Sequence, residues 1–176
     1  GGHTKTLFTI HNLANQGKLD ATQVLNFTGL TVEDHPNLSR RDIHDDINLI
    51  QQGILSADLV NTVSPSYAEE ILTNEYGYCL EGDLANRGNQ LSGILNGIDT
   101  GRFNPATDAD IPQTYTITTA DTGKAAAKAL LQQKSGLAVD PKVPVFGFVG
   151  RLTNQKGTEL LPGLIEQFLA TGAQLI

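Results

Sequence analysis

The sequence predicts an α/β fold built on parallel β-sheets. Three observations favour it: short apolar runs typical of buried strands recur along the chain, segments with helical spacing separate them, and turn residues mark the junctions. Strands that alternate with helices pair in parallel, because each helix returns the chain across the sheet. Of the 176 residues, 39% are hydrophobic and 18% charged, so the chain has enough apolar material for a core.

In the first half of the chain, apolar spacing and turn residues predict the elements. Four isoleucines within residues 42–55 recur at helical spacing. Ser64 followed by Pro65 is typical of a helix start, because serine caps the first turn and proline has no amide hydrogen to lose there. The predicted order is a strand over 6–10, a polar excursion with room for one short helix over 12–40, a helix over 42–55, a strand over 58–63, a helix over 64–72, a turn over 76–78, a helix over 81–89 and a strand over 92–95.

The second half begins with residues 99–119, which lack periodicity and are the best candidate for a linker. A helix rich in Ala, Lys, Leu and Gln is expected over 120–135, with Gly136 at its C-terminal end. In the last helical pattern, Pro162 requires that the helix begin near the proline or bend there. The remaining predicted elements are a strand over 143–149, a helix over 157–169 and a strand over 173–176.

Composition argues against several classes of protein. The formal net charge is −7, whereas a nucleic-acid surface needs a basic stripe. No apolar run approaches the ~20 residues of a membrane helix, and no signal peptide is visible. The single cysteine, Cys79, cannot form an internal disulfide and fits a reducing compartment. No Cys/His pattern has zinc spacing, so no metal site is predicted.

Residues 143–157 are the most informative segment for function. An apolar, β-rich run ends at Gly150, and two cations, Arg151 and Lys156, follow it. Ligands bind at the carboxyl ends of strands in open α/β sheets, and a helix N-terminus expected at Gly157 would add free amide hydrogens and a positive dipole end. This arrangement suits an anionic group such as a phosphate. From spacing alone, the interpretation that Arg151 and Lys156 are ordinary solvated loop cations is equally open.

Four blocks of sequence, spread over most of the chain, have distinctive residue types in a distinctive order. They are Thr9-Ile10-His11-Asn12-Leu13-Ala14-Asn15-Gln16-Gly17, Thr62-Val63-Ser64-Pro65-Ser66-Tyr67-Ala68-Glu69-Glu70-Ile71, Leu95-Asn96-Gly97-Ile98-Asp99 with Phe103-Asn104-Pro105-Ala106-Thr107-Asp108, and Gly150-Arg151-Leu152-Thr153 with Gln155-Lys156-Gly157. In this order they closely resemble the bacterial glycogen synthase and plant starch synthase family. That family consists of retaining, sugar-nucleotide-dependent glucosyltransferases with two Rossmann-like domains, the GT-B architecture.

The resemblance implies roles for particular residues. The family's matching arginine and lysine bind the diphosphate of the donor, so Arg151 and Lys156, beside Gly150, are expected to bind substrate and to stabilise charge on the leaving phosphate. His11 matches a histidine close to the donor glucose, and Asn96 matches an asparagine that faces the interdomain cleft. From the residues alone, other interpretations stay open. His11 would then be a strand-end histidine whose ring bonds to nearby backbone, and Asn96 would simply begin an Asn-Gly turn.

The resemblance also implies a domain organisation. Residues 1–98 match the C-terminal part of the N-terminal Rossmann-like domain, residues 99–119 the interdomain linker, and residues 120–176 the start of the domain that binds the sugar nucleotide. The family's Lys-x-Gly-Gly loop would precede residue 1, and its C-terminal glutamate motif would follow residue 176. The chain is therefore expected to be a central fragment that is inactive alone.

The implied function is extension of an α-1,4-glucan, glycogen or starch, from ADP-glucose with retention of configuration. The expected partners are a sugar-nucleotide donor and an α-glucan acceptor, without nucleic acid, membrane, metal or cofactor. UDP-glucose as donor, the oligomeric state, and the choice between bacterial cytoplasm and plastid stroma stay open. The alternatives are another GT-B transferase of the sucrose or trehalose-phosphate synthase type, and a non-catalytic glucan-binding relative.

Three residues depart from the family's pattern. Asn15 stands where the family usually has tyrosine, and Cys79 stands where it usually has glycine. Both changes put the local loop geometry in question. Phe103 replaces a common tryptophan and keeps an aromatic side chain.

Overall fold

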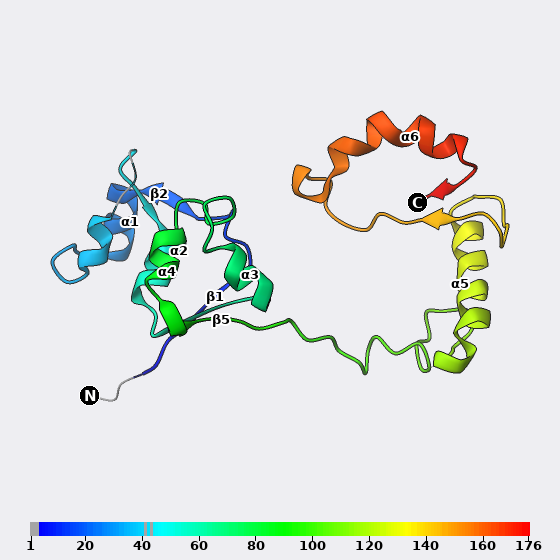
Figure 1. The fold of residues 1–176 in the computed structure, drawn as a ribbon, viewed down its shortest axis with the longest axis horizontal. Coiled ribbons are helices and arrows are strands. Elements are labelled where there is room, and N and C mark those ends of the chain that lie inside the picture. Colours follow the sequence, from blue (N-terminus) through cyan, green and yellow to red (C-terminus); the bar gives the residue numbers. More distant parts are fainter. Residues whose placement is uncertain (1–3, 41, 43) are drawn as a thin grey trace. The chain divides into compact units, whose positions relative to one another are not determined.

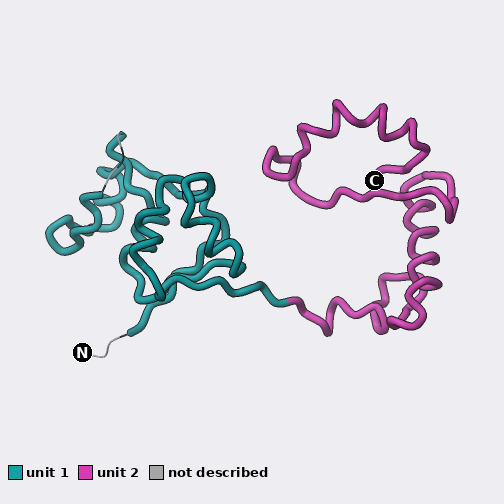
Figure 2. Tube along the Cα trace, viewed as in Figure 1, with its two compact units in different colours: residues 1–97 teal, residues 98–176 magenta. Residues whose placement is uncertain are grey.

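The computed structural model describes residues 4–40, 42 and 44–176, and the chain divides into two compact units, residues 1–97 and 98–176 (Figures 1 and 2). Residues 99–119 cluster with the second unit. The assignment of the two units to Rossmann-like domains joined by a linker stays a prediction. No helix of the described residues is long and apolar enough to cross a membrane. Nor do the described residues bring three or more His, Cys, Asp or Glu side chains together as a metal site.

The first unit is built on a parallel sheet of three strands in the order β1–β4–β5. These strands are β1 (Leu7–Ile10), β4 (Leu59–Thr62) and β5 (Leu91–Gly93). The predicted parallel pairing is confirmed. At the amino edge of the sheet, Lys5 and Thr6 donate hydrogen bonds to the Asp58 carboxylate and so join the start of β1 to the start of β4. These hydrogen bonds lower the pKa of Asp58 to about 2.

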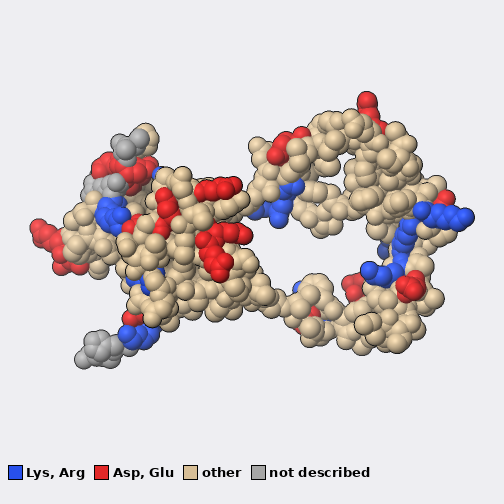
Figure 3. Space-filling model, viewed as in Figure 1, with Lys and Arg blue, Asp and Glu red and all other residues tan. Residues whose placement is uncertain are grey.

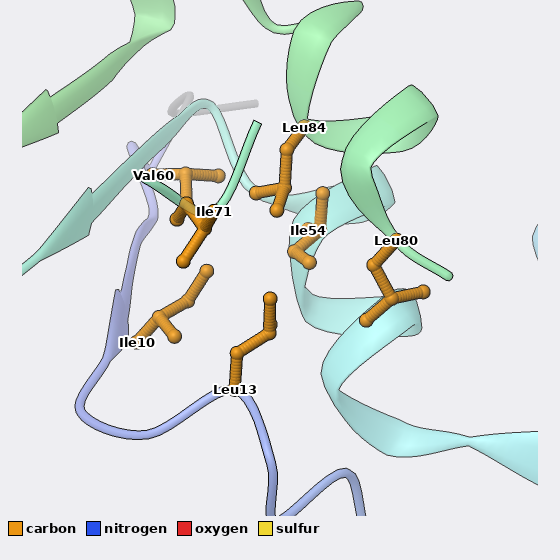
Figure 4. Packing of buried hydrophobic residues seen from close by; sticks show 7 residues of the cluster. All are labelled: Ile10, Leu13, Ile54, Val60, Ile71, Leu80 and Leu84. Atoms are coloured by element: carbon orange, nitrogen blue, oxygen red, sulfur yellow. The ribbon is translucent and has the colours of Figure 1, made fainter. Parts of the chain in front are cut away.

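One face of this sheet is covered by short helices that share a core with it. They are α2 (Leu49–Ser56), α3 (Pro65–Glu70) and α4 (Glu81–Ala85). Figure 4 shows the buried side chains converging between the strands and the helices: Ile10, Leu13, Ile54, Val60, Ile71, Leu80 and Leu84. Ile10, the last residue of β1, belongs to this core, and Thr62, the last residue of β4, is fully buried. The carboxyl edge of the sheet is therefore well packed and holds the segments that follow it in place.

The predicted polar excursion contains more structure than the sequence pattern indicates. It holds β2 (Lys18–Asp20), α1 (Ala21–Thr28) and a 3₁₀ turn, η1 (Pro36–Ser39). Strand β2 pairs antiparallel with β3 (Asp46–Asn48), and Ile47 of β3 is buried with Ala21 and Leu38 in a second small core.

The helix predicted over 42–55 is therefore wrong in its first half. Residues 46–48 form a strand instead, and the helix starts at Leu49, where the Asn48 side chain accepts a hydrogen bond from Gln51 N. The helical spacing of isoleucines is a local signal, and pairing with a strand 26 or more residues earlier overrides it. Ile43 of that pattern lies outside the described residues.

The second unit contains α5 (Ala120–Lys134), α6 (Leu161–Ala170) and a parallel pair of strands, β6 (Val145–Phe146) and β7 (Gln174–Leu175). Three 3₁₀ turns complete it: η3 (Ile117–Thr119), η4 (Asn154–Lys156) and η5 (Thr158–Leu160). The side chain of Gln132 on α5 is fully buried and bonds Gln174 Oε1 of β7 at 2.7 Å. The predicted helix over 120–135 is confirmed.

Other predicted elements are shorter than the sequence pattern. The helix expected over 81–89 ends at Ala85, and residues 88–90 form a 3₁₀ turn, η2 (Gly88–Gln90). The strand expected over 143–149 is regular only at 145–146, although Phe148 N still donates to Ile176 O at 2.8 Å. Helix α6 begins at Leu161 with Pro162 in its first turn, as the position of the proline predicts.

The turn between α3 and α4 holds two consecutive non-glycine residues in the left-handed region, Tyr78 with φ 51° and Cys79 with φ 67°. Gln16 Nε2 donates to Tyr78 O at 2.9 Å, and Leu80 N donates to Gly77 O at 2.8 Å, so the turn is held on both sides. The glycine that the family usually has at Cys79 adopts this conformation without the steric cost of a β-carbon.

We therefore expect Cys79→Gly to raise the free energy of unfolding by about 0.5–1 kcal/mol. Relief of about 1–2 kcal/mol of backbone strain exceeds the cost of a more flexible unfolded chain. Urea unfolding of the two proteins measures the difference. Cys79→Ala keeps the β-carbon and is the control. An equal gain from alanine would show that the thiol, not the backbone, is responsible.

Candidate functional site

His11 lies at the carboxyl edge of the first unit's sheet. It follows Ile10, the last residue of β1, whose carbonyl accepts a hydrogen bond from Thr62 Oγ1 at 2.8 Å in the core. His11 itself is exposed, and its imidazole makes no hydrogen bond or ion pair among the described residues. The alternative interpretation, a ring bonded to nearby backbone, is therefore not what the structure shows. The imidazole is free to meet a ligand.

The neighbours of His11 in its sequence block have structural roles. Leu13 is fully buried, and its N–H donates to the Tyr67 hydroxyl of α3 at 3.1 Å. Gln16 accepts from Asn48 Nδ2 at 2.7 Å and donates to Tyr78 O. These contacts fasten the loop after β1 to α2, to α3 and to the strained turn. Gln16 and Tyr67 belong to the sequence blocks that carry the family resemblance, which was the only indication in the sequence that they matter. Only the structure shows that they position the loop.

Ser64 and Asn96 follow the other two strands of the sheet. The Ser64 hydroxyl accepts from Tyr67 N at 2.9 Å and caps α3, as the Ser-Pro pattern predicts. The strand expected over 92–95, directly before Asn96, is wrong at its end, because β5 ends at Gly93 and Asn96 lies in an irregular, exposed segment. The last ladder contact is Ile94 N to Thr62 O at 2.8 Å. Among the described residues, no strand lies beyond the end of β4 for Asn96 to pair with.

The two predicted phosphate ligands lie in the second unit, after β6. Arg151 is exposed in the loop, and Lys156 is the last residue of η4. Neither side chain has a hydrogen bond or ion pair with any described residue. Gly150 is exposed as well, and a β-carbon built on it would lie 3.8 Å from the nearest atom, on the Phe148 ring. The loop therefore presents two uncompensated positive charges and leaves its glycine uncrowded.

The expected helix N-terminus at Gly157 is absent, which corrects the sequence analysis. Gly157 has φ 71°, and its N–H donates to Asn154 O at 2.9 Å, so it closes η4 in a left-handed conformation. The chain then makes a second 3₁₀ turn before α6 begins at Leu161. The dipole of α6 is thus a turn away from Lys156. Any anion site here depends on the two side-chain cations.

A family model described as the starch synthase catalytic domain matches residues 2–86. Glycogen synthases of Exiguobacterium sibiricum and Actinobacillus succinogenes are each 42% identical to this chain, over 98% and 99% of its length. The chain is similar to the glycogen and starch synthase family over nearly all of its length. The resemblance carried by the four sequence blocks is confirmed. The chain spans 35% and 37% of the length of these two synthases.

A solved structure of the family has the same fold. The catalytic domain of starch synthase IV from Arabidopsis thaliana, bound to ADP and acarbose, superposes with a TM-score of 0.85 and 34% identity, over 97% of this chain and 35% of that one. The predicted α/β fold with parallel sheets, part of a GT-B synthase architecture, is confirmed.

Charge is distributed unevenly over this chain. The first unit contains 12 acidic and 5 basic residues, whereas the second contains 7 of each. Figure 3 shows acidic side chains gathered over the first unit. The whole formal charge of −7 therefore belongs to the first unit. An anionic ligand is repelled less by the neutral second unit, which carries Arg151 and Lys156.

Proposed function

We propose that the synthase containing this chain extends an α-1,4-glucan with glucose from ADP-glucose, with retention of configuration. The observation that carries the proposal is that Arg151 and Lys156 are exposed and unpartnered among the described residues. Both lie in the sequence block whose counterpart in the glycogen and starch synthase family is expected to bind the donor diphosphate. The Arabidopsis relative is bound to ADP, which supports an adenine nucleotide as the donor's carrier. The curated relatives are bacterial, which favours the cytoplasm over a plastid stroma.

The chemistry proposed for Arg151 and Lys156 is electrostatic. When the bond between the anomeric carbon and the diphosphate oxygen breaks, negative charge builds on the leaving phosphate. Arg151 offers a planar fork of donors and Lys156 a compact positive charge. Both stabilise the developing charge more in the transition state than in the ground state, which is the condition for faster turnover.

The remaining site residues are proposed to hold the sugar. The free imidazole of His11, when neutral, donates one hydrogen bond and accepts another, which suits the hydroxyls of the donor glucose. Asn96 and Gly150 are proposed as substrate contacts, Asn96 through its amide and Gly150 through exposed backbone. ADP-glucose is the donor substrate, and we propose no separate cofactor.

Titration of ADP into the 176-residue chain tests the donor site. Arg151→Ala and Lys156→Ala should each weaken ADP binding about 10- to 100-fold, the usual loss for a hydrogen bond to a charged group. Lys142→Ala is the matched control, since it removes the same charge from an exposed position in the same unit. Its dissociation constant should stay within about twofold of the unsubstituted chain. Equal losses from Lys142 and Lys156 would contradict a specific site.

A further inference from the structure

Asn96 is the only asparagine of the chain that precedes a glycine, and the fold leaves both residues free. Asn96 and Gly97 are the last two residues of the first compact unit, and both are exposed. Residues 94–99 belong to no helix, strand or turn, so the Asn-Gly turn that the residue types alone leave open is not formed. The pair therefore lies in an irregular backbone that is surrounded by solvent.

The segment around this pair is fixed at its ends but not within itself. The sheet holds Ile94, whose N–H donates to Thr62 O at 2.8 Å. After the pair, the Asp99 carboxylate accepts hydrogen bonds from two backbone N–H groups, each at 3.0 Å. Among the described residues, no hydrogen bond involves residues 95–98. The side-chain amide of the asparagine and the backbone N–H of the glycine are therefore both unengaged.

These two groups are the reactants of asparagine deamidation, the reaction that makes asparagine a thermolabile residue. The backbone nitrogen of Gly97 loses its proton to water and attacks Cγ of Asn96. The carbon–nitrogen bond of the side-chain amide then breaks, ammonia leaves with a proton, and a cyclic imide remains. Water opens the imide at one of its two carbonyls and leaves an aspartyl or an isoaspartyl residue, each with a new carboxylate.

The glycine removes the main steric obstacle to this attack. Any other residue would place a β-carbon beside the attacking nitrogen and hinder its approach to the amide carbon. A β-carbon built on Gly97 meets nothing else within 4 Å, and the glycine does not have a positive φ, so alanine fits the same backbone. Asn74 offers the contrast, because it is exposed as well but precedes Glu75.

We propose that Asn96 is a site of spontaneous deamidation in the folded chain, and the asparagine that is modified first. The reaction adds one negative charge to a formal net charge of −7. In the isoaspartyl product it also adds one carbon to the backbone beside the boundary between the two units. The chemistry at Asn96 does not depend on the proposed function.

Only the consequence for activity rests on the proposed function. A carboxylate has no N–H to donate, and it repels an anionic ligand. Deamidation therefore removes the Asn96 amide that was assigned above to substrate contact and replaces it with a charge of the same sign as the donor diphosphate.

Incubation of the folded 176-residue chain at neutral pH and physiological temperature, followed by proteolysis and mass spectrometry, tests the proposal. Chromatography separates the aspartyl and isoaspartyl peptides, which have equal mass. Both products should accumulate at Asn96 at least about tenfold faster than at Asn74, a barrier difference of ~1.4 kcal/mol. Gly97→Ala should slow the reaction at Asn96 by a similar factor while the variant stays folded. Asn96→Gln should give no product at this position over the same period.

A synthetic peptide of residues 92–101 shows the rate without any protection by the fold, and Asn96 of the folded chain should react at a similar rate. Much slower reaction in the folded chain than in the peptide overturns the proposal, because the fold would then protect the asparagine. Equal rates in the unsubstituted and Gly97→Ala chains also overturn it, as does equally fast modification of Asn74. Each readout is chemical and does not require ADP binding, so unchanged ADP binding by Lys156→Ala would contradict only the donor site.

Discussion

Lys156→Ala is expected to slow glucose transfer about 100- to 1,000-fold, the usual loss when one preorganised donor to a developing negative charge is removed. The ammonium group is exposed and without a partner among the described residues, so no structural interaction is lost with it. The free energy of unfolding should change by less than about 0.5 kcal/mol, as for an ordinary surface substitution. Arg151→Ala should behave in the same way, because both cations are proposed to stabilise the same leaving group.

The measurement is transfer of labelled glucose from ADP-glucose to glycogen. A suitable host is the Exiguobacterium sibiricum glycogen synthase with its matching segment replaced by this chain, since the two are 42% identical over 174 residues. The effect should appear mainly in kcat, because the cations act most strongly in the transition state. Lys142→Ala in the same host is the control. Unchanged kcat for Lys156→Ala, in a host whose unsubstituted form is active, would remove Lys156 from the mechanism.

Gly93→Ala is expected to lower the free energy of unfolding by at least about 3 kcal/mol. A β-carbon built on Gly93 lies 2.0 Å from Ser64 O and 2.4 Å from Pro65 N. These are backbone atoms, and they form the capped start of α3, so no side-chain rotation relieves the overlap. Either β5 or α3 must move, and both belong to the edge of the sheet that carries His11.

Urea unfolding of the 176-residue chain measures this effect. Gly97→Ala is the matched control, because a β-carbon there meets nothing within 4 Å. Gly97→Ala should change stability by less than about 1 kcal/mol. The displacement caused by Gly93→Ala should also loosen the contact between Tyr67 of α3 and the Leu13 amide, which holds the loop after His11. Equal stability of the two alanine variants would contradict the close approach of β5 to α3.

Several local features could be predicted from the residues alone. Ser64 and Pro65 mark the start of α3 because their effects act within one turn. Pro162 defines the start of α6 for the same reason, and an alanine-rich composition is sufficient to predict α5. The four blocks identified the family because their residue types are specific and their order is preserved.

Other features depend on distant parts of the chain and could not be predicted locally. Ile47 belongs to a helical pattern but lies in a strand, because β2 offers a partner and the second core accepts its side chain. The pattern predicts a strand up to residue 95, just before Asn96, yet β5 ends at Gly93, opposite the last residue of β4. Gly157 opens a helical pattern in sequence but takes a left-handed conformation that delays α6 by one turn.

The sequence by itself therefore determined the resemblance to the family, the parallel α/β fold, and which side chains are candidates for binding a sugar nucleotide, because those properties reside in residue type and short-range spacing. The tertiary structure decided which of these side chains are free. It shows His11, Arg151 and Lys156 exposed and unpartnered among the described residues, whereas Gln16 and Tyr67 are engaged in holding a loop. Burial and hydrogen bonding depend on segments that meet only when the chain folds, so no local pattern can report them.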